Sequence, residues 1–209
     1  YNVLNSAKIN NVSKTIITST SEVYGTAQKI PILENHPLSA QSPYAASKIG
    51  ADQLALSFYK SFGLPVTIIR PFNTFGPRQS ARAIIPTIIT QLLQKKNLVK
   101  LGNLSPTRDF TYVEDTADAF IKTIKVKNIS GEIINIGNKF EISIKDIIKI
   151  IKRDFGYKFE VKLDKKRVRT KNSEVYRLLA SNIKAKKILK WSPKYYGQKG
   201  FKEGLKKTI

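Results

Sequence analysis

A tyrosine and a lysine four residues apart are the first groups in the sequence that could do acid–base chemistry. Tyr44 and Lys48 follow Ser42 and Pro43, a pair typical of a helix start with Ser42 as N-cap and proline at the first helical position. Residues four apart lie on one helix face, and an ammonium group beside a phenol favours the phenolate form. Such a phenol is a usable general acid or base near neutral pH. The same spacing is common in solvated pairs, so it needs support from elsewhere in the chain.

A cluster of hydroxyl and carboxylate groups precedes this helix. The β-branched run at residues 15–19 indicates a buried strand, and it leads into Thr20, Ser21 and Glu22. We expect the helix to cover residues 43–62, with Gly63 as its stop, and a second buried strand over residues 64–69. A helix followed by a buried strand is typical of a parallel βα arrangement.

Together, Thr20, Glu22, Tyr44 and Lys48 resemble the active site of the extended short-chain dehydrogenase/reductase family. Its members are NAD-dependent nucleotide-sugar epimerases, dehydratases and decarboxylases of carbohydrate biosynthesis. The resemblance covers essentially the whole chain. It implies an α/β protein with a Rossmann-like parallel sheet and a smaller α/β substrate-binding domain, NAD as cofactor, a nucleotide-sugar substrate and a homodimeric full-length form.

The domain boundaries follow from the same resemblance. We place residues 1–75 in the NAD-binding domain, with residues 109–137 returning to it. Residues 76–108 and 138–209 would form the nucleotide-sugar-binding domain. No glycine-rich phosphate loop of the G-x-x-G-x-x-G or G-x-G-x-x-G kind occurs in the sequence. Because the family carries this loop in its first third, we expect a truncated Rossmann-like sheet whose N-terminal third is missing.

The later segments resemble family motifs in the expected order. They read RPFNTFGPR at residues 70–78, G-x₅-RDFTYV at 102–113, RVRTKNSEV at 167–175 and KILKWSP at 187–193, where Lys190 replaces the usual glycine. The resemblance makes Asn73, Arg108 and Arg169 ligands of the substrate diphosphate, since a guanidinium fork matches phosphate oxygens. Taken alone, Arg108 and Asp109 would form a local salt bridge, and Arg169 would belong to a solvated basic run.

The resemblance also implies a role for each residue of the site. Tyr44 would take the proton of the sugar O4, Lys48 would favour its phenolate form and bind the nicotinamide ribose, and Thr20 would hydrogen-bond O4. Glu22 would remove the C5 proton. The predicted cofactor-binding residues are Ser19, Tyr44, Lys48 and Pro71, and the predicted substrate-binding residues are Ser21, Asn73, Arg82, Arg108 and Arg169.

Glu22 narrows the choice of reaction. Simple 4-epimerases need no base for C5, whereas 4,6-dehydratases and uronic-acid decarboxylases do. Ser21 departs from the Thr-Asp-Glu pattern of dTDP-glucose dehydratases, so the proton donor stays open. The runs at residues 19–28 and 70–82 look most like the nucleotide-linked N-acetylglucosamine 4,6-dehydratases of legionaminic-acid synthesis. A UDP-glucuronate decarboxylase, a 4-epimerase, and a non-catalytic remnant or assembly partner are the alternatives.

The composition argues against several classes of function. The 37 basic and 15 acidic residues give a charge of +22, but the lysines are scattered and no nucleic-acid-binding motif occurs, so nucleic acid is not the expected partner. Without cysteine and with one histidine, we expect no metal site. We expect His36 to be solvated in a polar loop and not catalytic. No apolar run approaches the roughly 18 residues of a membrane span, so we expect a cytoplasmic protein.

The remaining pattern predicts further helices and strands. We expect helices over residues 83–96 and 114–127, the second with Ala117, Phe120, Ile121 and Ile124 on its core side. A strand is predicted over residues 132–137, and an edge strand over 159–163. Ser143 and Asp146 have the layout of a capping box that starts a further helix.

Overall fold

Three parallel strands form the first sheet of the molecule. The computed structural model describes residues 1–95 and 97–209. Strands β1 (Thr15–Thr18), β2 (Val66–Pro71) and β6 (Ile133–Ile136) pair in parallel in the order β1-β2-β6. The central strand β2 is buried along almost its whole length, because a parallel sheet in an α/β protein is covered on both faces.

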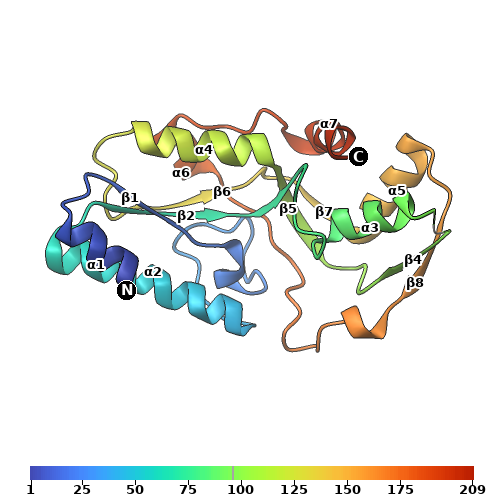
Figure 1. The fold of residues 1–209 in the computed structure, drawn as a ribbon, viewed down its shortest axis with the longest axis horizontal. Helices are drawn as coiled ribbons and strands as arrows, with labels where there is room; N and C mark the ends of the chain where they lie inside the picture. The colour runs from blue at the N-terminus through green and yellow to red at the C-terminus, as the bar shows by residue number, and fades with distance from the viewer. Residues whose placement is uncertain (96) are drawn as a thin grey trace.

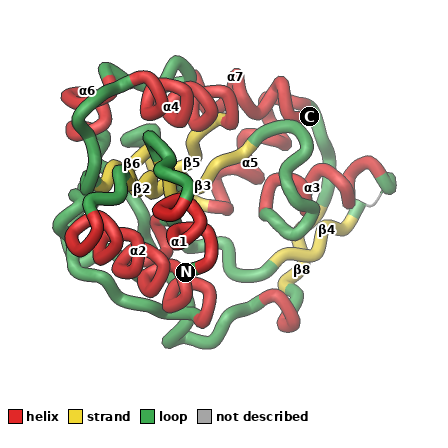
Figure 2. The backbone as a smooth tube through the Cα atoms, turned by 60° about the vertical axis from the view of Figure 1, so that its left-hand side comes forward, coloured by secondary structure: helices red, strands yellow, loops and turns green. Residues whose placement is uncertain are grey.

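Helices cover both faces of this sheet. Helices α1 (Asn2–Ile9) and α2 (Pro43–Phe62) lie on one face, and α4 (Val113–Lys125) and α6 (Ile183–Leu189) lie on the other (Figures 1 and 2). Alternate residues of β2 therefore join different cores: Ile68 packs with α1 and α2, and Ile69 packs with α4, α6 and Trp191. None of the helices in the described ranges combines the length and apolar character needed to cross a membrane.

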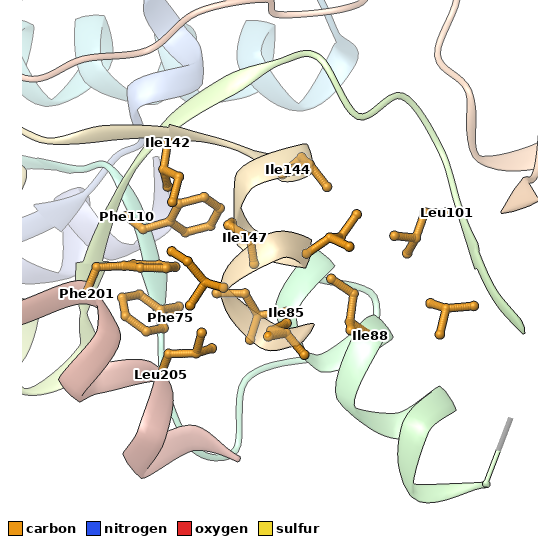
Figure 3. Packing of buried hydrophobic residues seen from close by; sticks show 14 of the residues in the cluster. Phe75, Ile85, Ile88, Leu101, Phe110, Ile142, Ile144, Ile147, Phe201 and Leu205 are labelled. Carbon is orange, nitrogen blue, oxygen red and sulfur yellow. The ribbon is translucent and has the colours of Figure 1, made fainter. Parts of the chain in front are cut away.

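A second set of elements surrounds a separate core. Strand β5 (Thr107–Tyr112) pairs in parallel with β3 (Asn73–Phe75) and antiparallel with β7 (Glu141–Ser143), while β4 (Leu98–Leu101) pairs in parallel with β8 (Glu160–Leu163). Helices α3 (Ile84–Leu93), α5 (Ile144–Phe155) and α7 (Gly197–Thr208) contribute to the core between these strands (Figure 3). Its buried side chains include Phe75, Ile85, Ile88, Leu101, Phe110, Ile142, Ile144, Ile147, Phe201 and Leu205. The predicted domain boundaries stay a prediction.

The predicted helix caps are present. Ser42 Oγ accepts a hydrogen bond from the Ala45 amide at 3.1 Å, and α2 ends at Gly63, whose φ of 68° is left-handed. At the start of α5, Ser143 Oγ accepts from the Asp146 amide at 3.0 Å. The Asp146 carboxylate accepts from Ser143 Oγ at 2.6 Å, where the side chain of a full capping box would accept from the backbone N–H.

Two helices differ in detail from the predictions. Helix α3 spans Ile84–Leu93, and residue 96 of the predicted helix lies outside the described residues. In α4, the predicted core side is only partly confirmed: Phe120 packs against the core, but Ala117, Ile121 and Ile124 are exposed. Ala119 and Thr123 are buried in their place. Thr123 can be buried because its hydroxyl donates to the Ala119 carbonyl at 2.8 Å.

His36 is also placed differently from the prediction of a solvated side chain. It is buried, its Nε2 accepts from the Gln28 amide at 3.1 Å, and its Nδ1 lies 2.8 Å from the Pro37 carbonyl oxygen. These partners fit a neutral ring with the proton on Nδ1. The ring packs edge-on against Tyr24 at 5.6 Å between centroids, so His36 anchors the loop after Tyr24.

Candidate active site

The predicted acid–base residues come from α2 and from a short 3₁₀-helix, η1 (Ser21–Tyr24), with its N-cap, which follows β1 in the chain. Thr20 caps η1, because its Oγ1 accepts a hydrogen bond from the Glu22 amide at 3.2 Å. Lys48, one turn into α2 from Tyr44, donates through Nζ to the Thr18 carbonyl at 2.9 Å. This bond ties α2 to the carboxyl end of β1, the edge at which parallel sheets bind ligands.

Two adjoining clefts bring most of the predicted residues together. One, of about 350 Å³, is lined by Glu22, Asn73, Arg82, Arg108 and Arg169, among others. The other, of about 670 Å³, is lined by Glu22, Arg82 and Arg169 together with Tyr44. The clefts share three residues, so Tyr44 and the predicted phosphate ligands border one continuous depression. Half of the Tyr44 surface, 51%, is exposed.

The other predicted residues do not line these clefts. Thr20 and Lys48 lie beside them through the contacts described above. Ser19 and Ser21 are buried, and the Ser19 hydroxyl donates to Asp52 at 2.8 Å. Pro71 ends β2 and is half-buried. The predicted ligand role of Ser21 therefore gains no support from its position.

Arginines give the cleft the character of an anion site. Arg108 donates to the Thr107 carbonyl at 2.9 Å, and its Nη2 lies 3.7 Å from the Glu174 carboxylate. Burial lowers the pKa of Arg108, while the neighbouring Glu174 raises it; an arginine remains charged in either case. Among the described residues, the Oδ1 atom of Asn73 and the Oε1 atom of Gln79 accept no hydrogen bond. Both residues line the cleft.

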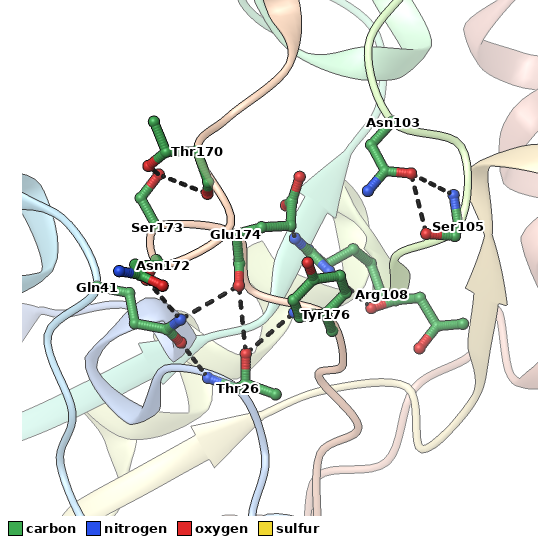
Figure 4. Close-up of polar contacts among 11 residues, drawn as sticks. Thr26, Gln41, Asn103, Ser105, Arg108, Thr170, Asn172, Ser173, Glu174 and Tyr176 are labelled. Atoms are coloured by element: carbon green, nitrogen blue, oxygen red, sulfur yellow. Dashed lines mark hydrogen bonds and ion pairs between the residues drawn. The ribbon is translucent and has the colours of Figure 1, made fainter.

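The segment after Arg169 crosses back to the first sheet and closes one side of the cleft (Figure 4). Gln41 donates through Nε2 to the carbonyls of Asn172 and Glu174, each at 3.2 Å. The Tyr176 amide donates to Thr26 Oγ1 at 3.1 Å. Thr26 and Gln41 thus form a latch that holds Glu174 beside η1. Thr26 lies in the run at residues 19–28 and Glu174 in the motif at 167–175, but neither pattern predicted the hydrogen bonds that join the two segments.

A comparison with protein families identifies the chain. The model of the GDP-mannose 4,6 dehydratase family matches residues 1–208. The chain belongs to this family. Members of the family are NAD-dependent nucleotide-sugar dehydratases and epimerases, as the resemblance predicted.

Individual relatives include both kinds of enzyme. Human dTDP-D-glucose 4,6-dehydratase is 34% identical over 95% of this chain and 56% of its own length. UDP-glucuronic acid 4-epimerase from Bacillus cereus, solved with UDP-glucuronic acid and NAD, has a TM-score of 0.89 and 30% identity over 99% of this chain and 63% of that one. TunA, an NAD-dependent NDP-hexosamine 5,6-dehydratase of tunicamycin biosynthesis, has a TM-score of 0.87 and 29% identity over 99% of this chain and 65% of that one.

The coverage of these relatives is partial. The chain spans between 55% and 66% of the length of the first curated relatives it matches. Its α/β fold with a Rossmann-like parallel sheet is confirmed by the structural likeness.

The sequence analysis did not predict a buried polar network that connects α2, β2 and η1. Asp52 Oδ2 accepts from Ser19 Oγ at 2.8 Å, from Arg70 Nε at 3.0 Å and from Arg70 Nη2 at 2.9 Å. Arg70 Nη1 donates to the Tyr24 hydroxyl at 2.9 Å, which donates to Asn135 Oδ1 at 2.7 Å. Burial raises the pKa of Tyr24, so its hydroxyl keeps the proton it donates. Extending the Tyr44–Lys48 helix face by four residues reaches Asp52 and could have found it.

The Arg-Asp pair of the family motif does not form a local salt bridge. Asp109 is fully buried and accepts from three backbone amides: Asn138 at 2.7 Å, Lys139 at 2.9 Å and Ala180 at 3.1 Å. The side chain of Asp109 therefore fastens two loops to β5, while its neighbour Arg108 lines the cleft.

The C-terminal family motif is also structural. Trp191 is fully buried, and its Nε1 donates to the Asp115 carbonyl at 3.0 Å. The Asp115 carboxylate accepts from the amides of Lys194 at 2.7 Å and Tyr195 at 3.0 Å. Lys190 ends α6 with a left-handed φ of 52°, which explains why glycine is usual at this position.

Proposed function

We propose that the protein is part of an NAD-dependent nucleotide-sugar 4,6-dehydratase that converts NDP-N-acetylglucosamine to a 4-keto-6-deoxy sugar. The observation that carries this proposal is the pair of adjoining clefts, both of which are lined by Glu22, Arg82 and Arg169, while Tyr44 lines one of them. A carboxylate in this place supplies the base for C5 that a simple 4-epimerase does not need. The likeness to TunA, a dehydratase of NDP-hexosamines, supports an amino-sugar substrate.

The residues present fit one end of NAD. Tyr44, Lys48 and Ser19 surround the carboxyl end of β1, and Lys48 uses only part of its donor capacity on the Thr18 carbonyl. The remaining N–H groups suit the hydroxyls of the nicotinamide ribose. A glycine-rich loop for the cofactor's phosphates does not occur in the 209 residues. When bound, NAD would accept the hydride from the sugar C4 and return it at C6.

The chain's own residues would move the protons. Tyr44, as phenolate, accepts the proton of O4 as the C–H bond at C4 breaks. Thr20 donates a hydrogen bond to O4, because its oxygen already accepts from the Glu22 amide and its hydroxyl proton remains available. The ketone at C4 makes the C5 proton acidic, and Glu22 removes it. The C6 hydroxyl then leaves as water, and C5 regains a proton when hydride is returned at C6. The two protons gained in these steps balance the two removed from O4 and C5.

The arginines would hold the substrate through its diphosphate. Arg82 and Arg169 line both clefts and Arg108 lines one of them, so the three guanidinium groups supply fixed positive charge to the site. Asn73 offers its amide at the end of β3 nearest β2. The sugar would then extend toward Glu22 and Tyr44.

Turnover of a defined substrate tests the proposal. The 209-residue chain is incubated with NAD⁺ and UDP-N-acetylglucosamine, and the expected product is a 4-keto-6-deoxy sugar. Glu22→Gln should lower turnover by about 10²-fold or more, the usual contribution of a general base. Glu203→Gln, which removes a carboxylate from an exposed position of α7, is the matched control and should not. Release of CO₂ from UDP-glucuronate, or a C4 epimer without loss of water, would instead assign the decarboxylase or epimerase reaction.

A non-catalytic remnant or assembly partner is the second candidate. The 209 residues contain no glycine-rich phosphate loop, so NAD binding by this chain is the property to measure. Calorimetric titration with NAD⁺ separates the two candidates. A dissociation constant tighter than about 1 mM, equivalent to about −4 kcal/mol, would exclude the remnant.

A further inference from the structure

The Asp52–Arg70–Tyr24 network joins the elements that carry the candidate catalytic residues, although its three side chains are buried away from the clefts. Asp52 lies on α2 one turn beyond Lys48, Arg70 lies on β2, and Tyr24 is the last residue of η1. Asn135 on β6 completes the path. Every step from α2 to η1 is therefore a hydrogen bond between side chains.

The burial of this network is costly and suggests a purpose beyond stability. Arg70 is 1% exposed and Asp52 is fully buried. The desolvation of a buried ion pair offsets much of its attraction, so apolar residues of similar size often give equal stability. What an ion pair with directional hydrogen bonds adds is a fixed geometry.

We propose that Tyr24 is a positioning residue, held by Arg70 and Asn135, that fixes Glu22 relative to Tyr44 and Lys48. This inference rests on the proposed function. Tyr24 and Glu22 share the single turn of η1, which is closed by the Gly25 amide donating to the Glu22 carbonyl at 3.1 Å. Arg70, in turn, is gripped by Asp52 on the helix that carries Tyr44 and Lys48.

Two kinds of contact hold Tyr24, the last residue of η1, in place. The Tyr24 hydroxyl accepts from Arg70 Nη1 at 2.9 Å and donates to Asn135 Oδ1 at 2.7 Å. Its ring also lies under the Arg70 guanidinium at 4.9 Å. Loss of the hydroxyl would leave both polar partners unpaired and free the turn to shift, and a displacement of about 1 Å can cost about 10²-fold in rate.

Two matched tyrosine variants test this role. Tyr24→Phe removes only the hydroxyl oxygen. Tyr195→Phe is the control, because Tyr195 is also buried and its hydroxyl also donates to a side chain, Glu114 at 2.9 Å, but it packs beside α7 and lines neither cleft. Each variant is compared with the unaltered chain by steady-state kinetics and by hydrogen–deuterium exchange.

The expected result is local to η1. Tyr24→Phe should lower kcat for the nucleotide sugar by about 10- to 100-fold and leave KM within about twofold, since the arginines that would bind the diphosphate are carried by other elements. Exchange of the Gly25 amide should accelerate by about tenfold or more, while amides of β5 stay unchanged. Tyr195→Phe should change neither kcat nor the Gly25 amide.

Three results would decide against the proposal: an unchanged kcat in Tyr24→Phe, an exchange rate that rises equally in η1 and β5, or an equal loss of kcat in Tyr195→Phe. If the unaltered chain shows no turnover, the proposed function fails, and the exchange of the Gly25 amide alone decides whether Tyr24 positions the turn.

Discussion

Replacing Asp109 by asparagine should change how the stability of the protein depends on pH. Two effects oppose each other at this carboxyl. Its three backbone N–H donors favour the charged form, and its complete burial favours the neutral form. Burial is the larger effect and raises the pKa of Asp109 from 3.8 to about 7.

The direction and size of the effect follow from linkage. Between pH 3.8 and about 7 the folded state holds a proton on Asp109 that the unfolded state has lost, so the free energy of unfolding falls as pH rises through this window. At about 1.36 kcal/mol per pH unit, the change is on the order of 4 kcal/mol. Asp109→Asn cannot titrate and should lack it. The variant should also lose at least one buried hydrogen bond, which costs about 1–3 kcal/mol at any pH.

Urea unfolding of both proteins between pH 4.5 and 8 measures this difference. The stability advantage of the unaltered protein over Asp109→Asn should shrink as pH rises. Asp146→Asn is the control, because hydrogen bonds from Lys149 and Ser143 hold the pKa of that carboxyl below its usual value of 3.8. Asp146 is then charged in both states throughout this range, so the stability difference between the unaltered protein and Asp146→Asn should not change with pH. An advantage of Asp109 that grows with pH would show that its three amide donors outweigh burial, and the reasoning would be refuted.

Three further predictions concern single side chains. Lys190→Gly should stabilise the protein by about 0.5–1 kcal/mol, because it relieves the left-handed φ of 52°; a rise in melting temperature of about 2–4 °C per kcal/mol would show it. Gly204→Ala should destabilise by about 1–3 kcal/mol, since its Cβ would lie 2.8 Å from the Tyr112 ring. The paired Gly50→Ala should stabilise by about 1 kcal/mol, because no described atom lies within 4 Å of the new Cβ, and equal denaturation midpoints would contradict both. Arg169→Gln should weaken UDP binding about tenfold in calorimetric titrations, which is the effect of losing one charged hydrogen bond. Tyr195→Phe is the control and should bind UDP with unchanged affinity.

Much of the first sheet could be predicted from the sequence, because its signals are local. The β-branched runs of β1 and β2 predicted buried strands, and Ser42 with Gly63 predicted both ends of α2. The buried side of α4 could not be predicted from apolar spacing, because it carries polar residues. Thr123 is satisfied by the Ala119 carbonyl of its own helix, and Asp115 by the amide of Lys194, which only the fold brings close. The burial of His36 was not predicted for a different reason: its partners are backbone groups of its own loop, whose conformation the sequence does not reveal.

Family motifs mark Glu22, Tyr44 and the predicted arginines, and these residues line the two clefts. Their roles stay predictions. Tyr24, Arg70 and Asp52 stand at or near the same motifs, but nothing in the sequence shows that they meet. Their network forms only when η1, α2 and β2 pack together, which is a property of the tertiary structure.

The hydrogen bond between Thr26 and Tyr176 has a consequence for the order in which the molecule folds during synthesis. The two residues are 150 positions apart, whereas the strands of the first sheet are all present once Ile136 has been synthesised. Long-range contacts of this kind form late, because the chain must close a large loop before they can be gained. The strands of the first sheet can therefore pair on the ribosome before the segment that carries Arg169 and Glu174 has been synthesised. In a nascent chain, the residues proposed for acid–base chemistry are therefore synthesised well before Arg169, one of the arginines proposed to hold the diphosphate.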